Sequence, residues 1–292
     1  MIEIRHLSHS LGKKTVLREV DLQIPENTIL GIVGTNGAGK STLLRLLSGV
    51  YLPDCGSILY DGMSPADPKT RRDIFFLPDD PYYSAHMTAK ELLNFYAAFY
   101  ETIDREIFSK LLENYQIDQN GRLRNFSKGM RRQVFIALAL AIEPKYLLLD
   151  EAFDGLDPFS RKFFKDAIIS LVEKGHTTVL IASHSLRELE DFCDRFILID
   201  AGAVKEQGDI AEHVGGLCKF ELAFTEPVEK GLFDSLPVVS LSISGRFVQI
   251  VLNGKSDEMA ERLTTLSPAI MDEMPLDFEE AFIHDVRKER SL

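Results

Sequence analysis

Hydrophobic and polar positions follow different periods along the chain, and these periods predict its strands and helices. Residues 1–28 alternate between apolar and polar side chains around a turn at 12–14, which predicts an antiparallel pair of strands. Uninterrupted apolar runs predict buried strands at residues 29–33, 74–77, 146–149 and 177–182. Helical periods and end signals predict helices at residues 42–47, 88–100, 107–115, 134–142 and 158–175. Strands and helices therefore alternate, as in an α/β fold.

The C-terminal part of the chain has a pattern of its own. Three strands and then one helix are predicted there, at residues 219–224, 238–242, 247–251 and 257–266. We therefore expect two domains. The larger covers residues 1–212 and contains a helical insert at about residues 82–142, and the smaller is an α+β domain over residues 213–292.

Residues 34–41 read Gly-Thr-Asn-Gly-Ala-Gly-Lys-Ser and lie between a predicted strand and a predicted helix, which is the pattern and context of a phosphate-binding loop. Glycines let the backbone N–H groups turn towards phosphate oxygens, and the N-terminus of the following helix adds partial positive charge. Lys40 is expected to reach the β- and γ-phosphates, and the hydroxyl of Ser41 to bind Mg²⁺. A glycine-rich turn that binds nothing is the weaker alternative, because both flanks match. The expected phosphate-binding residues are Gly34, Thr35, Asn36, Gly37, Ala38, Gly39, Lys40, Ser41 and Thr42.

Two carboxylates, Asp150 and Glu151, follow the apolar run at 146–149. In a protein with a phosphate-binding loop the Asp at this position binds Mg²⁺, so Asp150 is an expected metal ligand. Glu151 comes next, where it can accept a proton from the attacking water or orient that water. An isolated Asp-Glu pair would more often be a solvated turn, but its pairing with the loop favours the catalytic interpretation. His184 lies just beyond the strand at 177–182 and is expected near the same nucleotide, because ligands of open α/β sheets bind at the carboxyl ends of the strands.

Composition narrows the possible partners and location. The 292 residues carry a net charge of −12 and no run of five Lys or Arg, which argues against nucleic acid as the main partner. The three cysteines are far apart and lack Cys-x-x-Cys spacing, so we expect them to be reduced and packed. The N-terminal residues lack the pattern of a signal peptide, and the longest apolar stretch, 134–142, is shorter than the roughly 20 residues of a membrane span. We therefore expect a cytosolic chain whose membrane association goes through a partner.

In this order over about residues 1–212, these motifs resemble the ATP-binding subunits of ABC transporters. The loop at 34–41 is similar to the Walker A motif of that family, residues 146–151 to Walker B with its catalytic glutamate, residues 154–157 to the D-loop, and His184 to the switch histidine. The resemblance implies a phosphate-loop NTPase core with a mixed sheet, an antiparallel N-terminal subdomain and the helical insert. It also implies ATP and Mg²⁺ as cofactors, and it adds Asp157 to the nucleotide-binding residues.

Residues 127–130, Ser-Lys-Gly-Met, stand where the family has its signature motif, and Ser127 also has the sequence context of a helix N-cap. In the family the signature of one subunit covers the ATP bound by the other. The resemblance therefore implies a head-to-tail dimer, with a second copy or with another ATP-binding subunit, in which Ser127 and Gly129 contact nucleotide. A capped helix N-terminus that faces a γ-phosphate would stabilise this dimer only while the phosphate is present.

Three features depart from the usual family pattern. The common signature is Leu-Ser-Gly-Gly-Gln, whereas this chain has Lys128 and Met130 within it, a variant associated with exporter-type ATPases. Asp79 replaces a Gln that commonly contacts Mg²⁺, and we expect it to be the equivalent metal ligand. Leu11 replaces the aromatic residue that usually stacks on adenine, which leaves the preference for ATP over GTP open.

The resemblance implies an ATPase subunit that uses Glu151 as base and drives export through a separate transmembrane permease at the cytoplasmic face of the membrane. A soluble ABC-type ATPase acting on a cytosolic complex is the alternative; two such domains or a coiled-coil insert would favour it, and the sequence has neither. A phosphate-loop GTPase or a small-molecule kinase would need a substrate lid or an Asn-Lys-x-Asp spacing, which residues 253–257 lack. Asp79 leaves open a nucleotide-gated module without turnover. Residues 275–282 resemble the closing helix of drug and lipid exporter ATPases.

Overall fold

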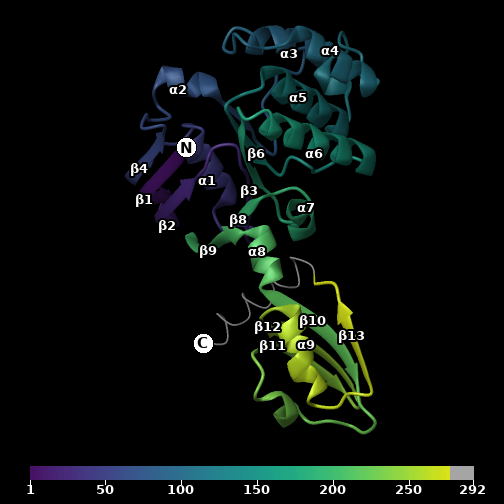
Figure 1. Cartoon of the computed structure of the whole chain (residues 1–292). Helices are drawn as coiled ribbons and strands as arrows, with labels where there is room; N and C mark the ends of the chain where they lie inside the picture. Colours follow the sequence, from purple (N-terminus) through teal and green to yellow (C-terminus); the bar gives the residue numbers. More distant parts are fainter. Residues whose placement is uncertain (277–292) are drawn as a thin grey trace. The chain divides into compact units, whose positions relative to one another are not determined.

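The computed structural model describes residues 1–276 and divides the chain into two compact units, Met1–Gln207 and Gly208–Leu292. Figure 1 shows the elements of both units in sequence colours. The two-domain organisation with a boundary after residue 212 stays a prediction. Among residues 1–276, no helix combines the length and the apolar character that crossing a membrane requires.

The first unit begins with an antiparallel sheet of three strands in the order β2–β1–β4 (Figure 1). The strands are β1 (Ile2–Leu11), β2 (Lys14–Ile24) and β4 (Cys55–Tyr60). Apolar residues of one face, among them Ile2 and Ile4, are buried, and Ile2 lies opposite Ile24 in the register. The predicted antiparallel pair in residues 1–28 is therefore confirmed.

The centre of the first unit is a six-stranded sheet in the order β5–β6–β7–β3–β8–β9. Its strands are β3 (Ile29–Val33), β5 (Ile74–Leu77), β6 (Tyr146–Asp150), β7 (Thr178–Ala182), β8 (Arg195–Asp200) and β9 (Ala203–Asp209). Neighbouring strands from β5 to β8 are parallel. Every residue of β3, β6 and β7 is buried, as expected for strands covered on both faces. The carboxyl ends of these strands meet at one edge, which places Asp150 beside the loop that follows Val33.

Helices surround this sheet, and α3 to α6 gather on one side of the first unit, away from the β2–β1–β4 sheet (Figure 1). Thr88 and Glu91 form a capping box at the start of α3, the helix predicted from residue 88. The helices of the first unit are α1 (Lys40–Leu47), α2 (Pro68–Asp73), α3 (Ala89–Tyr96), α4 (Arg105–Asn114), a 3₁₀ turn at Leu123–Asn125, α5 (Lys128–Ile142), α6 (Pro158–Glu173) and α7 (Leu186–Glu190).

The second unit has its own antiparallel sheet, in the order β11–β12–β10–β13, with a separate core. Phe220 and Ile250 of the sheet and Leu263 of helix α9 are fully or almost fully buried in that core. The elements of this part of the chain are α8 (Ile210–Gly215), β10 (Leu217–Ala223), a 3₁₀ turn at Lys230–Phe233, β11 (Val238–Ser244), β12 (Phe247–Asn253), α9 (Ser256–Thr264) and β13 (Ile270–Met274).

Two sequence-based expectations need correction, and one is not covered. The helix predicted for residues 88–100 ends at Tyr96, because the chain turns so that the hydroxyl of Tyr100 donates to the carbonyl of Ile74 at 2.7 Å. The three cysteines are free thiols, but Cys55 is exposed rather than packed, since it stands at the solvent-facing start of β4. The predicted closing helix at residues 275–282 lies outside the described residues from 277 onward.

Candidate nucleotide site

The loop between β3 and α1 has the backbone conformation that its glycines permit. Gly37 and Gly39 have φ values of +81° and +116°, in the left-handed region that side chains disfavour. Gly39 also passes so close to β2 that an added Cβ would lie 2.8 Å from Cδ2 of Leu17. Helix α1 begins directly after Gly39 with neither an acidic residue in its first turn nor a side-chain cap. Its N-terminus is therefore available to an anion.

Lys40 is the first residue of α1 and is 6% exposed. Its Nζ donates to the carbonyl of Gly34 at 2.7 Å and lies 3.4 Å from the carbonyl of Thr35. Burial lowers the pKa of Lys40, while the carboxylates of Glu151 and Asp150 act in the opposite direction. The amine is thus folded back into the loop, close to the two acidic groups at the end of β6.

A cavity of about 310 Å³ opens above this loop and collects many of the predicted residues. It is lined by Leu11, Lys14, Val16, Asn36, Gly37, Gly39, Lys40, Ser41, Thr42 and Glu151. The sequence did not identify Lys14 and Val16, although their position directly after the turn that follows Leu11 could have indicated them. Leu11, 45% exposed, and Val16 give this cavity an apolar wall in place of an aromatic ring.

Ser41 and Asp150 come together as the sequence predicted for metal ligands. The hydroxyl of Ser41 donates to Oδ1 of Asp150 at 3.0 Å. Asp150 is 1% exposed, and its pKa is raised by burial and by Glu151, against the effect of the Ser41 hydrogen bond. A nearby cation would offset this unfavourable buried charge, and hydroxyl and carboxylate oxygens are ligands that Mg²⁺ prefers. The residues therefore fit Mg²⁺.

Glu151 and His184 also come together. Oε2 of Glu151 lies 2.9 Å from Nδ1 of His184, and the backbone N–H of His184 donates to the same oxygen at 3.3 Å. The hydrogen bond to Glu151 raises the pKa of His184. Glu151 has φ +48°, a left-handed conformation that is uncommon outside glycine and is often found at functional sites. Its backbone N–H donates to Ala182 at 2.9 Å, which ties it to β7.

The signature residues lie elsewhere in the first unit. Ser127 caps α5 as predicted, with its Oγ accepting from the backbone N–H of Met130 at 3.1 Å. Gly129 approaches the D-loop so closely that an added Cβ would lie 2.6 Å from the carbonyl oxygen of Gly155. Asp157 caps α6 through the backbone N–H groups of residues 159 and 160. Within the described part of the chain, none of Ser127, Gly129 and Asp157 lines the 310 Å³ cavity.

The structure places the carboxylate of Asp79 against helix α5. Its Oδ1 accepts from Nη2 of Arg132 at 3.0 Å and lies 3.7 Å from Nζ of Lys128. The role of Asp79 as a Mg²⁺ ligand stays a prediction. The sequence did not identify Arg132, and its place on the signature helix, next to Arg131, was the available signal.

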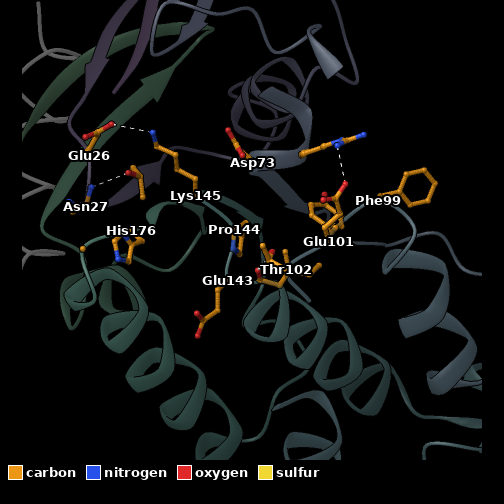
Figure 2. A pocket seen from close by; sticks show the side chains of 15 residues that line it. Glu26, Asn27, Asp73, Phe99, Glu101, Thr102, Glu143, Pro144, Lys145 and His176 are labelled. Carbon is orange, nitrogen blue, oxygen red and sulfur yellow. Dashed lines mark hydrogen bonds and ion pairs between the residues drawn. The ribbon is translucent and has the colours of Figure 1, made fainter. Parts of the chain in front are cut away.

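A larger cavity, of about 610 Å³, lies at the opposite end of the parallel strands (Figure 2). Its lining includes the residues that precede β6 and β7, such as Lys145 and His176. Several of its charged side chains are paired with one another. Nζ of Lys145 lies 3.6 Å from Oε1 of Glu26 (Figure 2). Nη1 of Arg72 lies 3.2 Å from Oε1 of Glu101. This cavity is separate from the phosphate-binding loop, which stands at the carboxyl ends of the same strands.

Comparisons with known proteins agree with the geometry. A family described as "ABC transporter" matches residues 17–154. The ABC transporter ATP-binding protein YtrB of Bacillus subtilis is 30% identical over 97% of this chain and 97% of its own length. The linearmycin resistance ATP-binding protein LnrL of the same organism is 30% identical over 74% of this chain and 72% of its own. A solved structure of an ATP-binding subunit of an ABC transporter is 28% identical, with a TM-score of 0.67 over 73% of this chain and 91% of its own.

The expected fold class is therefore confirmed, and so is the resemblance drawn from the motifs. The relative that matches nearly the whole chain and the structural neighbour share one description, that of an ATP-binding component of an ABC transporter. This chain belongs to the ATP-binding proteins of ABC transporters, a family of nucleotide-binding ATPases.

Proposed function

We propose that this chain is the ATP-hydrolysing subunit of an ABC exporter, which binds MgATP, dimerises and drives a separate transmembrane permease. The observation that carries the proposal is the carboxylate of Glu151, which lines the same cavity as Lys40 and Ser41 and is held at 2.9 Å by His184. A carboxylate fixed beside a phosphate-binding loop is suited to activate water for attack on a γ-phosphate.

Each residue of the site has a distinct part in this mechanism. The backbone of the loop at 34–41 and the N-terminus of α1 bind phosphate oxygens, and Lys40 offsets their negative charge. Mg²⁺ held by Ser41 and Asp150 would neutralise further charge on the phosphates. Glu151 accepts a proton from the attacking water or orients it, and His184 keeps the carboxylate in place for this step.

The dimer is supported by the position of the signature helix. Ser127 caps the N-terminus of α5, and the first turn of α5 carries no acidic side chain. Such an end favours an anion. Ser127, Gly129 and Asp157 do not line the cavity of their own subunit among the described residues, so we assign them to the nucleotide of a second subunit, identical or related. Loss of the γ-phosphate would then weaken the dimer and convert hydrolysis into movement.

Export is supported by the likeness to LnrL, whose name assigns it to linearmycin resistance. A transmembrane partner is supported by cbiO1 of Clostridium perfringens, described as part of the ABC transporter complex cbiONQ. That structure is 26% identical, with a TM-score of 0.59 over 72% of this chain and 89% of its own. On this chain, a groove of about 530 Å³ between α2 and α3 exposes Phe95 and Phe99, 52% and 56% accessible. We assign this groove to a helix of the permease, which would place the chain at the cytoplasmic face of the membrane.

Measuring phosphate release by the purified chain tests the ATPase assignment. The wild type should hydrolyse ATP in the presence of Mg²⁺. Glu151→Gln should bind ATP, lose at least about a hundredfold in turnover, and accumulate as a dimer. Glu113→Gln, on the exposed face of α4, is the matched control and should behave as wild type. Undiminished turnover in Glu151→Gln would remove this residue from the mechanism.

Affinity purification from detergent-solubilised membranes of the native cell tests the partner. A polytopic membrane protein recovered in fixed stoichiometry is the expected result, and a second ATP-binding subunit in the same complex would show a heterodimer. Recovery with soluble partners alone would support the alternative, an ABC-type ATPase that acts on a cytosolic complex, and would leave the ATPase chemistry unchanged.

A further inference from the structure

We propose that Asp79 and Arg132 are a positioning pair that ties the loop after β5 to the signature helix α5. The proposal rests on the proposed function, because it gives the pair a role in ATP turnover. Asp79 follows β5, which ends at Leu77 beside the strand that carries Asp150. Arg132 lies in the second turn of the helix that Ser127 caps. The pair therefore joins the nucleotide end of the sheet to the segment assigned to the nucleotide of the second subunit.

Arg132 is 2% exposed, and its guanidinium makes three hydrogen bonds to one short loop. Nη1 donates to the carbonyl of Pro78 at 2.9 Å, and Nη2 donates to the carbonyl of Asp79 at 2.6 Å and to its Oδ1 at 3.0 Å. A buried guanidinium depends on such partners, because an unpaired buried charge is strongly unfavourable. Arg132 therefore fixes both the backbone and the side chain of Asp79 relative to α5.

The charges at the start of α5 explain why an acidic residue is needed there. Lys128, Arg131 and Arg132 share one face of the helix, because residues three and four apart are neighbours. The helix dipole opposes cations at an N-terminus, and α5 has no acidic side chain in its first turn. Oδ1 of Asp79 supplies negative charge 3.0 Å from Arg132 and 3.7 Å from Lys128. The Cζ atom of Arg131 lies 5.6 Å from the centroid of the Tyr83 ring, a cation–π contact that adds a second link to the same loop.

These contacts separate two possible roles of Asp79. As a metal ligand it would act together with Ser41 and Asp150, and its removal would raise the Mg²⁺ requirement. As a positioning residue it acts through Arg132, and its removal would disturb how α5 is held without changing the affinity for Mg²⁺. The geometry favours positioning, because Oδ1 of Asp79 is bound by Arg132, whereas Ser41 is the group bound to Asp150.

Steady-state ATPase kinetics distinguish the two roles. Asp79→Asn should lower kcat about tenfold, while the KM for ATP and the Mg²⁺ concentration at half-maximal rate stay at their wild-type values. Arg132→Lys should act in the same direction, and the double variant should be no slower than the slower single variant. Asp80→Asn removes the same charge from the next residue and should leave turnover unchanged. Two results would overturn the proposal. One is a tenfold rise in the Mg²⁺ concentration that Asp79→Asn needs for its half-maximal rate. The other is a loss of kcat in the double variant that equals the product of the two single losses.

Amide hydrogen exchange without nucleotide tests the same link independently of turnover. In Asp79→Asn, the amides of residues 130–132 at the start of α5 should exchange about tenfold faster than in wild type and in Asp80→Asn. If Arg132→Lys does not fold, Asp79→Asn alone decides the question. The side chain of Asp79 is half exposed, so we expect this variant to fold. If the wild-type chain hydrolyses no ATP, that outcome counts against the proposed function. The hydrogen-exchange result still tests whether the pair positions α5. Unchanged exchange in Asp79→Asn would show that the pair does not position α5.

Discussion

Glu151 and His184 stand at the ends of two adjacent parallel strands, and their side chains meet with 2.9 Å between Oε2 and Nδ1. The sheet creates this contact, because Asp150 at the end of β6 lies opposite Ala182 at the end of β7. Glu151, directly after Asp150, and His184, two residues after Ala182, are therefore brought to the same edge. The contact therefore gives the candidate base a fixed orientation.

The pKa of His184 should report this contact directly. The hydrogen bond to the carboxylate of Glu151 and the charge of that carboxylate raise the pKa, and the charges of Asp154 and Glu188 add to the increase. A raised pKa in the folded chain means that the contact stabilises the fold fully below the ordinary pKa of His, and that this stabilisation is lost as the pH rises through the raised value. We expect NMR titration to show an elevated His184 pKa in wild type and a clear decrease in Glu151→Gln.

Asp154→Asn is the matched variant for this titration, since it removes a smaller contribution to the same pKa. It should lower the pKa of His184 less than Glu151→Gln does. An equal His184 pKa in wild type and Glu151→Gln would show that the two side chains do not interact in solution.

Lys40 should be required for nucleotide affinity. Its amine, 6% exposed, lies within the loop that is expected to hold the phosphates, and its removal would leave those phosphates without their main cation. We expect Lys40→Ala to raise the Kd for ATP at least about tenfold, measured by isothermal titration calorimetry. Lys13→Ala, in the exposed turn between β1 and β2, should bind ATP as wild type does. Equal affinities in the two variants would contradict this assignment of the loop.

Much of the site could be predicted because its residues follow strands that pattern alone identifies. Lys40, Asp150 and His184 each come at or shortly after the end of a predicted buried strand, and parallel strands bring such positions to one edge. The contact of Asp79 with Arg132 could not be predicted in this way. It joins residues 53 positions apart, and it depends on how α5 packs against the loop after β5.

The missed elements differ in how much signal they carry. β8 contains the apolar run Phe196–Ile199 and had the pattern of a buried strand. β9 has no fully buried residue, and Lys205 and Gln207 are exposed, so its sequence lacks the apolar run or alternation that would indicate a strand. α2 has six residues, and such a short helix depends on its cap at Asp67 and on Pro68 rather than on an apolar period.

Gly39 and Gly37 should differ in their tolerance of a side chain. Both have positive φ, at which alanine is strained. An added Cβ at Gly39 would also lie 2.8 Å from Leu17 and 3.2 Å from the carbonyl oxygen of Val16, whereas at Gly37 nothing lies within 4 Å. We expect Gly37→Ala to cost about 1 kcal/mol of unfolding free energy and Gly39→Ala about 2–3 kcal/mol, measured by urea denaturation. Equal losses would mean that β2 does not press against the loop in solution.

Asp61 should make the first unit sensitive to acid. Burial acts to raise its pKa, but hydrogen bonds from the N-terminal ammonium, Tyr146 and Lys145 outweigh burial and hold the pKa well below the usual range. A lowered pKa means that this stabilisation is present above the ordinary pKa of Asp and is lost as the pH falls through the lowered value. Asp61→Asn should therefore be less stable than wild type at neutral pH, and the difference should shrink towards about pH 3. Urea unfolding followed by circular dichroism over this range measures it, with Asp166→Asn on the exposed face of α6 as the control. A difference in unfolding free energy that stays constant with pH would show that the charge of Asp61 does not contribute. A loss of packing alone would lower the stability by the same amount at every pH.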